Sequence, residues 1–147
     1  MRSAVIIAML AALVSGAGDI ANAETPTHGA NIVGLWATGS EGGRVRIYNC
    51  GSGLCGKIVD ATRIRANPDQ RDERNSDRAL RSRKLLGLVV LSGFKGGSSE
   101  WKGGPVYDPE SGDGAKNGYL KLRADGKLEV KGCVAFICRT KVWTRVG

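Results

Sequence analysis

The sequence predicts a small all-β domain, an antiparallel barrel of about eight short strands with one short helical turn. In several segments apolar and polar residues alternate with a period of two, which is typical of half-buried strands. Glycine-rich turns separate these segments. A single segment has helical character, which is too little to supply β-α-β crossovers, so antiparallel pairing is favoured. A two-sheet sandwich is the alternative architecture.

The strands are expected in chain order, with turns between them. They cover residues 32–38, 44–47, 56–61, 88–94, 100–107, 119–122, 127–130 and 141–146. The Asp-Gly pair at 125–126 supplies the positive φ of a tight hairpin, so the strands on either side of it should pair. Four aliphatic side chains then share one face: Leu120, Leu122, Leu128 and Val130. The Gly-rich segments 96–97 and 112–114 are predicted as turns, and 103–104 as a bend.

A charged excursion, residues 63–84, interrupts the strand pattern and contains arginine, lysine, aspartate and glutamate but few apolar residues. Excursions of this length in compact domains are usually functional or disordered. Leu85 and Leu86 directly follow it and are expected to anchor it to the barrel. The helical turn is expected over residues 77–86, with Asp77 as its N-cap.

The first 23 residues have the pattern of a secretory signal peptide. Arg2 provides a positive start, residues 4–14 are apolar, and the small-residue site Ala21-Asn22-Ala23 follows. The apolar stretch is shorter than the roughly 20 residues that span a bilayer, so cleavage after Ala23 is favoured over an uncleaved anchor. The sequence therefore predicts one mature domain, residues 24–147, without a transmembrane segment, that is periplasmic or secreted.

Four cysteines form two pairs of identical spacing: Cys50 and Cys55, Cys133 and Cys138. An even number of cysteines in an exported domain predicts disulfides. Pairing within each C-x₄-C unit is favoured because Gly51 to Leu54 resembles a hairpin tip with the two cysteines facing across it. The alternatives are a bridge between the two units and a four-cysteine zinc site, and no metal is predicted.

The chain carries a formal net charge of +8, which favours anionic partners. An exported domain rarely meets nucleic acid, so envelope phosphates, acidic glycans and acidic proteins are the expected partner classes. The oligomeric state is not predicted. A net positive charge can also serve only to keep a domain soluble, so the charge by itself does not identify a ligand.

No catalytic residue and no cofactor are predicted. The single histidine, His28, lies close to the expected mature N-terminus, where a catalytic base is rare. Paired carboxylates for a hydrolase could come from a set of four residues: Asp72, Asp77, Asp108 and Glu110. The segment 108–112 is better explained as turn chemistry, because aspartate and proline each favour turn conformations.

Motifs along most of the mature chain resemble the DUF2147 family, an exported bacterial domain of unknown function. They are GLW (34–36), RVRIYNCG (44–51), LCGKI (54–58), LRSR (80–83), LLG (85–87), WKGGPVYDPESG (101–112) and RTKVWTR (139–145), with Asp72, Asn75 and Asp77 between them. The resemblance implies a lipocalin-like barrel, one of the calycins. In that superfamily a Gly-x-Trp and a basic residue of the last strand stack to close the barrel floor, and Trp36 and Arg145 occupy these places.

Two functions remain open. In the first, the barrel binds a small, partly apolar or anionic ligand, and its inward side chains line a pocket or pack into a solid core. These side chains are Val45, Ile47, Leu120, Leu122, Leu128 and Val130, with Arg81 and Arg83 of the excursion near the head group. In the second, the protein docks on a partner or an anionic surface through its basic excursion and the apolar segment 134–137. That segment could instead be tucked under the end of the barrel.

Overall fold

The structure is a computed structural model, and it describes residues 32–147. The expected signal peptide, its cleavage site after Ala23, and His28 lie outside the described residues. Within residues 32–147, no helix is both long enough and apolar enough to cross a membrane.

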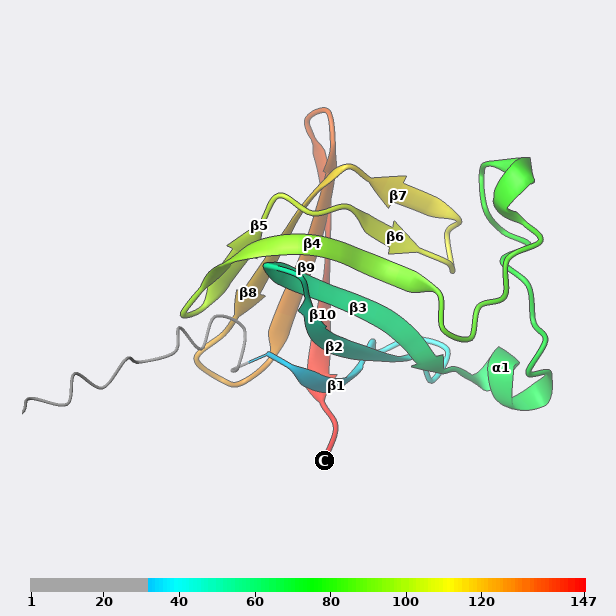
Figure 1. The fold of residues 1–147 in the computed structure, drawn as a ribbon, viewed down its shortest axis with the longest axis horizontal. Coiled ribbons are helices and arrows are strands. Elements are labelled where there is room, and N and C mark those ends of the chain that lie inside the picture. Colours follow the sequence, from blue (N-terminus) through cyan, green and yellow to red (C-terminus); the bar gives the residue numbers. More distant parts are fainter. Residues whose placement is uncertain (1–31) are drawn as a thin grey trace, which may run out of the picture.

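Ten strands make up the sheet (Figure 1). They are β1 (Gly34–Ala37), β2 (Arg44–Cys50), β3 (Gly53–Asp60), β4 (Val89–Gly97), β5 (Glu100–Lys102), β6 (Val106–Asp108), β7 (Asp113–Ala115), β8 (Asn117–Leu122), β9 (Leu128–Val134) and β10 (Ile137–Arg145). Eight of them follow the order β3-β2-β1-β10-β9-β8-β5-β4, and β4 pairs with β3 to close the ring. Every pairing is antiparallel, which confirms the barrel predicted from the period-two pattern.

Three segments differ from the sequence prediction. The turn predicted at 96–97 is wrong, because both glycines belong to β4 and pair with β5, and the chain turns at 98–99 instead. The strand expected over 100–107 is divided into β5 and β6, because Gly103 adopts a φ of +88° and turns the chain between them. The turn predicted at 112–114 is partly wrong, since Asp113–Ala115 forms β7. β7 pairs with β6 over three residues, and this tertiary pairing outweighs the weak strand propensity of aspartate and glycine. The resulting β6–β7 hairpin attaches to β4 through Leu91 and Val106.

The helical content is small and differs in detail from the prediction. Asp77 caps the 3₁₀ turn η1 (Arg78–Leu80) by accepting a hydrogen bond of 2.9 Å from the Ala79 amide, as predicted. That turn ends at Leu80 and does not extend to Leu86. A second helix, α1 (Thr62–Ala66), was not predicted. It buries Ile64 at the start of the excursion.

The barrel interior beside β1 and β8 is a packed core. Its largest fully buried side chains are Ile32, Trp36, Ile47, Leu91, Phe94, Trp101, Leu120 and Leu128. These residues come from strands on opposite sides of the ring, so their burial holds the closed sheet together. None of these side chains lines the cavity described below.

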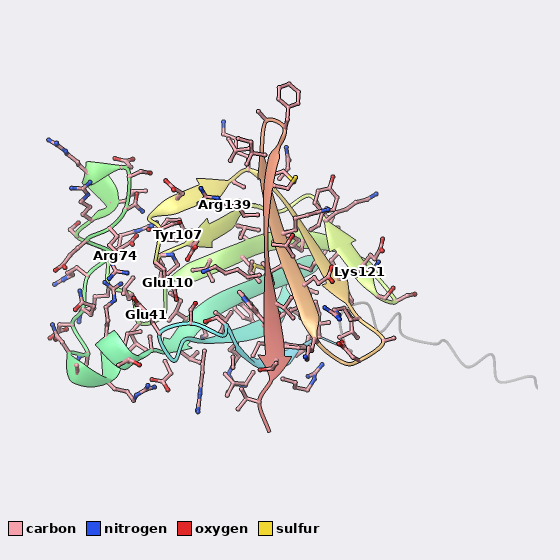
Figure 2. The ribbon with its side chains drawn as sticks, turned by 180° about the vertical axis from the view of Figure 1, so that it is seen from behind. Glu41, Arg74, Tyr107, Glu110, Lys121 and Arg139 are labelled. Atoms are coloured by element: carbon pink, nitrogen blue, oxygen red, sulfur yellow. A yellow bond between two sulfur atoms is a disulfide. The ribbon has the colours of Figure 1, made fainter. Side chains whose placement is uncertain are left out.

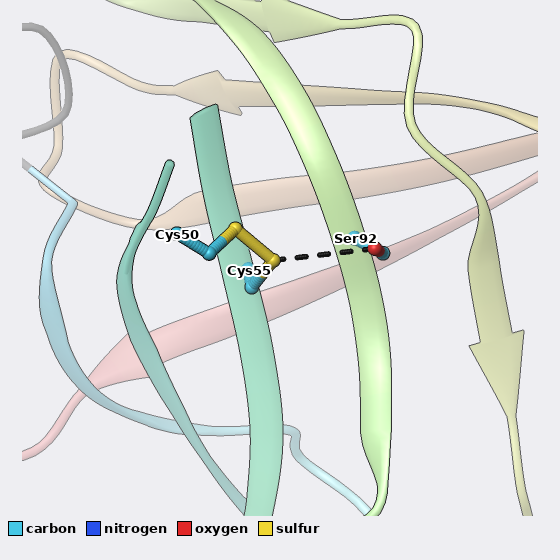
Figure 3. Close-up of a disulfide and its surroundings, with 3 residues drawn as sticks. All are labelled: Cys50, Cys55 and Ser92. Carbon is cyan, nitrogen blue, oxygen red and sulfur yellow. Dashed lines mark hydrogen bonds between the residues drawn. A yellow bond between two sulfur atoms is a disulfide. The ribbon is translucent and has the colours of Figure 1, made fainter. Parts of the chain in front are cut away.

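Both disulfides join the cysteines within one C-x₄-C unit. Cys50 bonds to Cys55 across the β2–β3 turn, and Cys133 bonds to Cys138 across the β9–β10 turn. The Sγ of Cys55 also lies 4.0 Å from the Ser92 hydroxyl on β4 (Figure 3). Each bridge therefore constrains the end of one hairpin. It does not link strands that are distant in the sequence, so the strand order of the barrel depends on core packing.

Trp36 and Arg145 face each other across the β1–β10 pair. The guanidinium carbon of Arg145 lies 4.5 Å from the centroid of the Trp36 ring, and an Arg145 Nη1–H donates to the Val33 carbonyl. The Trp36 indole donates to the Ile32 carbonyl at 2.8 Å. This geometry matches the stack expected from the resemblance, and its contribution to stability remains a prediction.

We expect Trp36→Leu and Arg145→Met to be non-additive in the free energy of unfolding. A cation over an indole contributes about 0.5–2 kcal/mol. The stability loss of the double variant should therefore be smaller, by this amount, than the sum of the losses of the two single variants. Urea denaturation of the four proteins in the cycle measures this coupling. Trp101→Leu combined with Arg145→Met is the control pair and should be additive. Strict additivity at Trp36 would show that the stack has no energetic role.

Candidate functional site

A cavity of about 490 Å³ lies beside the packed core, on the side of α1 and the β6–β7 hairpin. Its inner walls are apolar and come from the barrel strands, α1 and the residue that follows the excursion. These side chains are Val45, Ile58, Ile64, Leu85, Val90, Val106, Val130 and Trp143. The barrel interior is therefore solid in one part and hollow in another.

The hollow part follows from the division of the strand at Gly103. β8 pairs with β5 before the break and with β9 on its other side, while β7 pairs with β6 only. The β6–β7 hairpin thus leaves the ring and forms one side of the cavity. Leu85 closes a further side, which confirms it as an anchor, whereas Leu86 is exposed.

Alternate residues of β10 form the polar wall of the cavity. Arg139, Lys141 and Trp143 are spaced by two, so they point to the same face of the strand. Arg139 is exposed, Lys141 is half-buried and Trp143 is 5 % exposed, so the three run from the mouth to the interior. The Trp143 Nε1–H is buried and has no hydrogen-bond acceptor among the described residues.

Lys141 is held at the mouth by two carboxylates. Its Nζ lies 3.0 Å from Asp108 Oδ2 and 3.1 Å from Glu110 Oε2, and Ser40 donates to Glu110 at 2.7 Å. Partial burial by itself lowers the pKa of Lys141, but the hydrogen bonds and charges of Asp108 and Glu110 outweigh it and raise that pKa above its usual value. Lys141 is therefore charged at neutral pH. Figure 2 shows Glu110, Tyr107 and Arg139 gathered at this end of the barrel, away from Lys121.

The other two candidate carboxylates have different partners. Asp77 caps η1, and Asp72, which also belongs to the excursion, is fully buried. Tyr107 donates to Asp72 at 2.5 Å, Arg83 binds the second carboxylate oxygen at 2.7 Å, and Asn75 donates to it at 2.9 Å. Burial, and then the hydrogen bond to the Asp72 carboxylate, raise the pKa of Tyr107 far above its ordinary value, so the phenol remains a donor.

The basic excursion is folded back on the barrel through these contacts. The Arg81 Nε–H donates to the Asn75 carbonyl at 2.7 Å, and Arg83 pairs with Asp72. Neither arginine lines the cavity. The sequence hypothesis placed both beside a ligand head group. In the structure both arginines brace the excursion: Arg83 pairs with the buried Asp72 carboxylate, and Arg81 binds a backbone carbonyl.

The six predicted lining residues divide into two groups. Val45 and Val130 line the cavity. Ile47, Leu120 and Leu128 belong to the packed core, and Leu122 is partly buried against it. The period-two pattern correctly placed them on the inner face, but a period does not give the height of a residue along the barrel axis.

Sequence reasoning did not assign Arg139, Lys141, Trp143 or Tyr107 to the site. The alternation of the first three along one strand was visible in the sequence and could have marked a polar inner wall. Nothing in the sequence could have paired Lys141 with residues 31 and 33 positions earlier. Within residues 32–147, no group of three or more histidine, cysteine or acidic side chains is arranged to hold a metal ion.

A closed antiparallel barrel with a cavity inside one end defines the lipocalin-like class of proteins. The family model described as "Uncharacterized protein conserved in bacteria (DUF2147)" matches residues 34–145, and the chain belongs to this family. This confirms the resemblance seen in the motifs.

A solved structure supports the same fold. The protein HP1028 of Helicobacter pylori, described as belonging to the lipocalin family, superimposes with a TM-score of 0.64. The two chains are 20 % identical, and the match covers 78 % of this chain and 82 % of HP1028. No curated protein matches the chain.

Proposed function

We propose that the protein is an exported binding protein that holds a small, partly apolar ligand in the barrel cavity and does not change it chemically. The observation that carries this proposal is the cavity itself, whose inner walls are apolar and whose mouth carries charged side chains. Cavities of roughly 300–1,000 Å³ with apolar walls and a few polar groups are typical of small-molecule sites. The cavity here, about 490 Å³, is within that range.

The apolar walls suit the apolar part of the ligand. The charged side chains at the mouth, Arg139 and Lys141 among them, can face a polar head group there. The proposed ligand is an apolar chain or ring bearing a carboxylate or a similar oxygen group.

The mouth adds little charge preference of its own. Within residues 32–147, Arg139 and Asp113 line it without an ion-pair partner, while Glu41, Asp60 and Lys141 are paired. The two unpaired charges have opposite sign, so their long-range effects largely cancel. Affinity should therefore fall only modestly when salt is raised, because most of it comes from the buried apolar surface.

Filling the cavity should weaken binding strongly. We expect Val130→Trp to weaken the binding of an environment-sensitive fluorescent fatty acid at least tenfold, because the indole occupies the space between β9 and the β6–β7 hairpin. Val142→Trp is the matched control: Val142 pairs with Glu129 on the neighbouring strand but is exposed. Fluorescence titration measures the fatty-acid affinity of both variants. Equal affinities of Val130→Trp and Val142→Trp would contradict a binding site inside the barrel.

The alternative function, docking through the basic excursion, has less support. Its cations are largely neutralised at short range. Pairs form between Arg63 and Glu41, Arg65 and Asp60, Arg74 and Glu41, Arg83 and Asp72, and Lys84 and Asp69. A paired guanidinium offers little free charge to an anionic surface.

A further inference from the structure

The turn between β9 and β10 carries an unusual group of exposed apolar side chains, which we call the apolar tip, residues 134–137. Phe136 is 100 % exposed, Ile137 71 % and Val134 61 %. The hairpin that bears them extends beyond the rest of the barrel (Figure 1). The sequence left open whether this segment is tucked under the barrel, and the structure shows that it is not.

The apolar tip is held in one shape. The Cys133–Cys138 disulfide closes the base of the hairpin, and these two residues are also paired in the strand register. Ala135 adopts a φ of +53°, a conformation that side-chain-bearing residues seldom take. Because the turn is already ordered, binding through it costs less conformational entropy than binding through a free loop.

Three cations lie at the base of the apolar tip, and none of them forms an ion pair within residues 32–147. Lys131 and Arg139 lie on the two strands of the hairpin, and Lys116 precedes Asn117, which pairs with Cys133. We call these three residues the basic collar. From residue 130 to residue 147 the sequence contains no aspartate or glutamate. The hairpin is therefore apolar at its end and positively charged directly behind it.

We propose that the apolar tip inserts into the surface of a lipid bilayer that contains anionic lipids, with the basic collar at the level of the head groups. Phe136 lies in the two-residue turn beyond the Val134–Ile137 pair, so its backbone is at most two residues, about 7 Å, beyond the disulfide. This projection is comparable to the roughly 5–10 Å depth of interfacial insertion. A convex apolar projection fits a fluid surface. A protein partner would need a matching apolar socket, and the charge pattern favours the anionic lipid surface.

Docking in this way also orients the cavity. Val134 and Ile137 of the tip and Arg139 of the collar line its mouth. The mouth therefore faces the bilayer when the tip is inserted, and an amphipathic ligand can move between lipid and cavity with little exposure to water. This consequence rests on the proposed function, whereas insertion of the tip does not.

The test uses vesicles of phosphatidylcholine with and without phosphatidylglycerol, and protein purified in its exported form with its N-terminus determined. Wild-type protein should cosediment with phosphatidylglycerol vesicles at low salt. Phe136→Ser should reduce the partition coefficient at least tenfold, and Lys131→Ser or Arg139→Ser about fivefold each, the effect expected of one cation near an anionic surface. Leu86→Ser, an exposed leucine on the excursion, is the control and should bind like wild type.

A reporter variant reads insertion directly. In Phe136→Trp the new indole should shift its emission to shorter wavelength and resist a water-soluble quencher when phosphatidylglycerol vesicles are added. The three native tryptophans are at most 5 % exposed, so they add little change. An unshifted reporter, wild-type-like cosedimentation of Phe136→Ser, or a shift that requires a protein partner would each overturn the proposal. Fatty-acid affinity in vesicle-free solution should be the same in Phe136→Ser and wild type, so failure of docking is distinguishable from failure of the cavity site.

Discussion

Replacing Gly112 with alanine should cost about 3–5 kcal/mol of unfolding free energy, whereas the same replacement at Gly126 should cost only about 1–2 kcal/mol. Both glycines have a φ of +79°, so the conformational strain is matched. A Cβ on Gly112 would lie 1.7 Å from the Arg74 carbonyl oxygen, while a Cβ on Gly126 meets nothing within 4 Å. The difference between the two variants therefore measures the close approach of the excursion to the turn before β7.

The structural consequence of Gly112→Ala should be local undocking of the excursion. The Gly112 carbonyl accepts a hydrogen bond of 2.9 Å from the Ser76 amide, and this bond cannot form once the two segments separate. Urea denaturation should give the stability loss, and hydrogen exchange at Ser76 should show the lost protection. Similar losses for Gly112→Ala and Gly126→Ala would mean that the excursion is not packed against this turn.

Replacing Asp72 with alanine should cost about 3 kcal/mol, because it leaves Tyr107, Asn75 and Arg83 without their common acceptor in a buried position. Asp77→Ala is the control within the same excursion. Asp77 is exposed and only caps η1, so its loss should cost about 1 kcal/mol. Thermal or urea unfolding of the two variants compares these costs.

The tyrosine titration gives an independent measurement of the Asp72 contact. Burial is the main cause of the raised pKa of Tyr107, and the hydrogen bond and charge of Asp72 add to it. In Asp72→Ala the pKa of Tyr107 should therefore fall toward its ordinary value, whereas in Asp77→Ala it should stay raised. Alkaline titration followed by tyrosinate absorbance measures this. An unchanged titration in Asp72→Ala would show that the Tyr107–Asp72 hydrogen bond does not form.

These two predictions concern the same feature, the attachment of the excursion to the barrel. Ile64 of α1, Leu85, and Tyr107 all line the cavity. A change that undocks the excursion therefore opens the cavity wall, and fatty-acid binding should weaken together with stability. The basic excursion thus supports the binding site structurally, although Arg81 and Arg83 do not line the cavity.

The sequence by itself determined the parts of this protein that depend on neighbouring residues. Alternation along the chain identified most strands and the inner face of each, and Asp125-Gly126 marked the β8–β9 hairpin. The short spacing of each cysteine pair predicted its partner, and Asp77 was recognised as a helix cap. Each of these features is decided within a few residues, where backbone geometry and side-chain chemistry act directly.

Only the tertiary structure decided how deep each inward residue lies and which distant residues meet. Ile47 and Val45 are two positions apart on β2 and both are buried, yet only Val45 lines the cavity. The Asp72–Tyr107 hydrogen bond joins residues 35 positions apart, and β7 forms because β6 lies beside it. Such contacts depend on the register and closure of the whole sheet, which bring together segments that no local pattern relates.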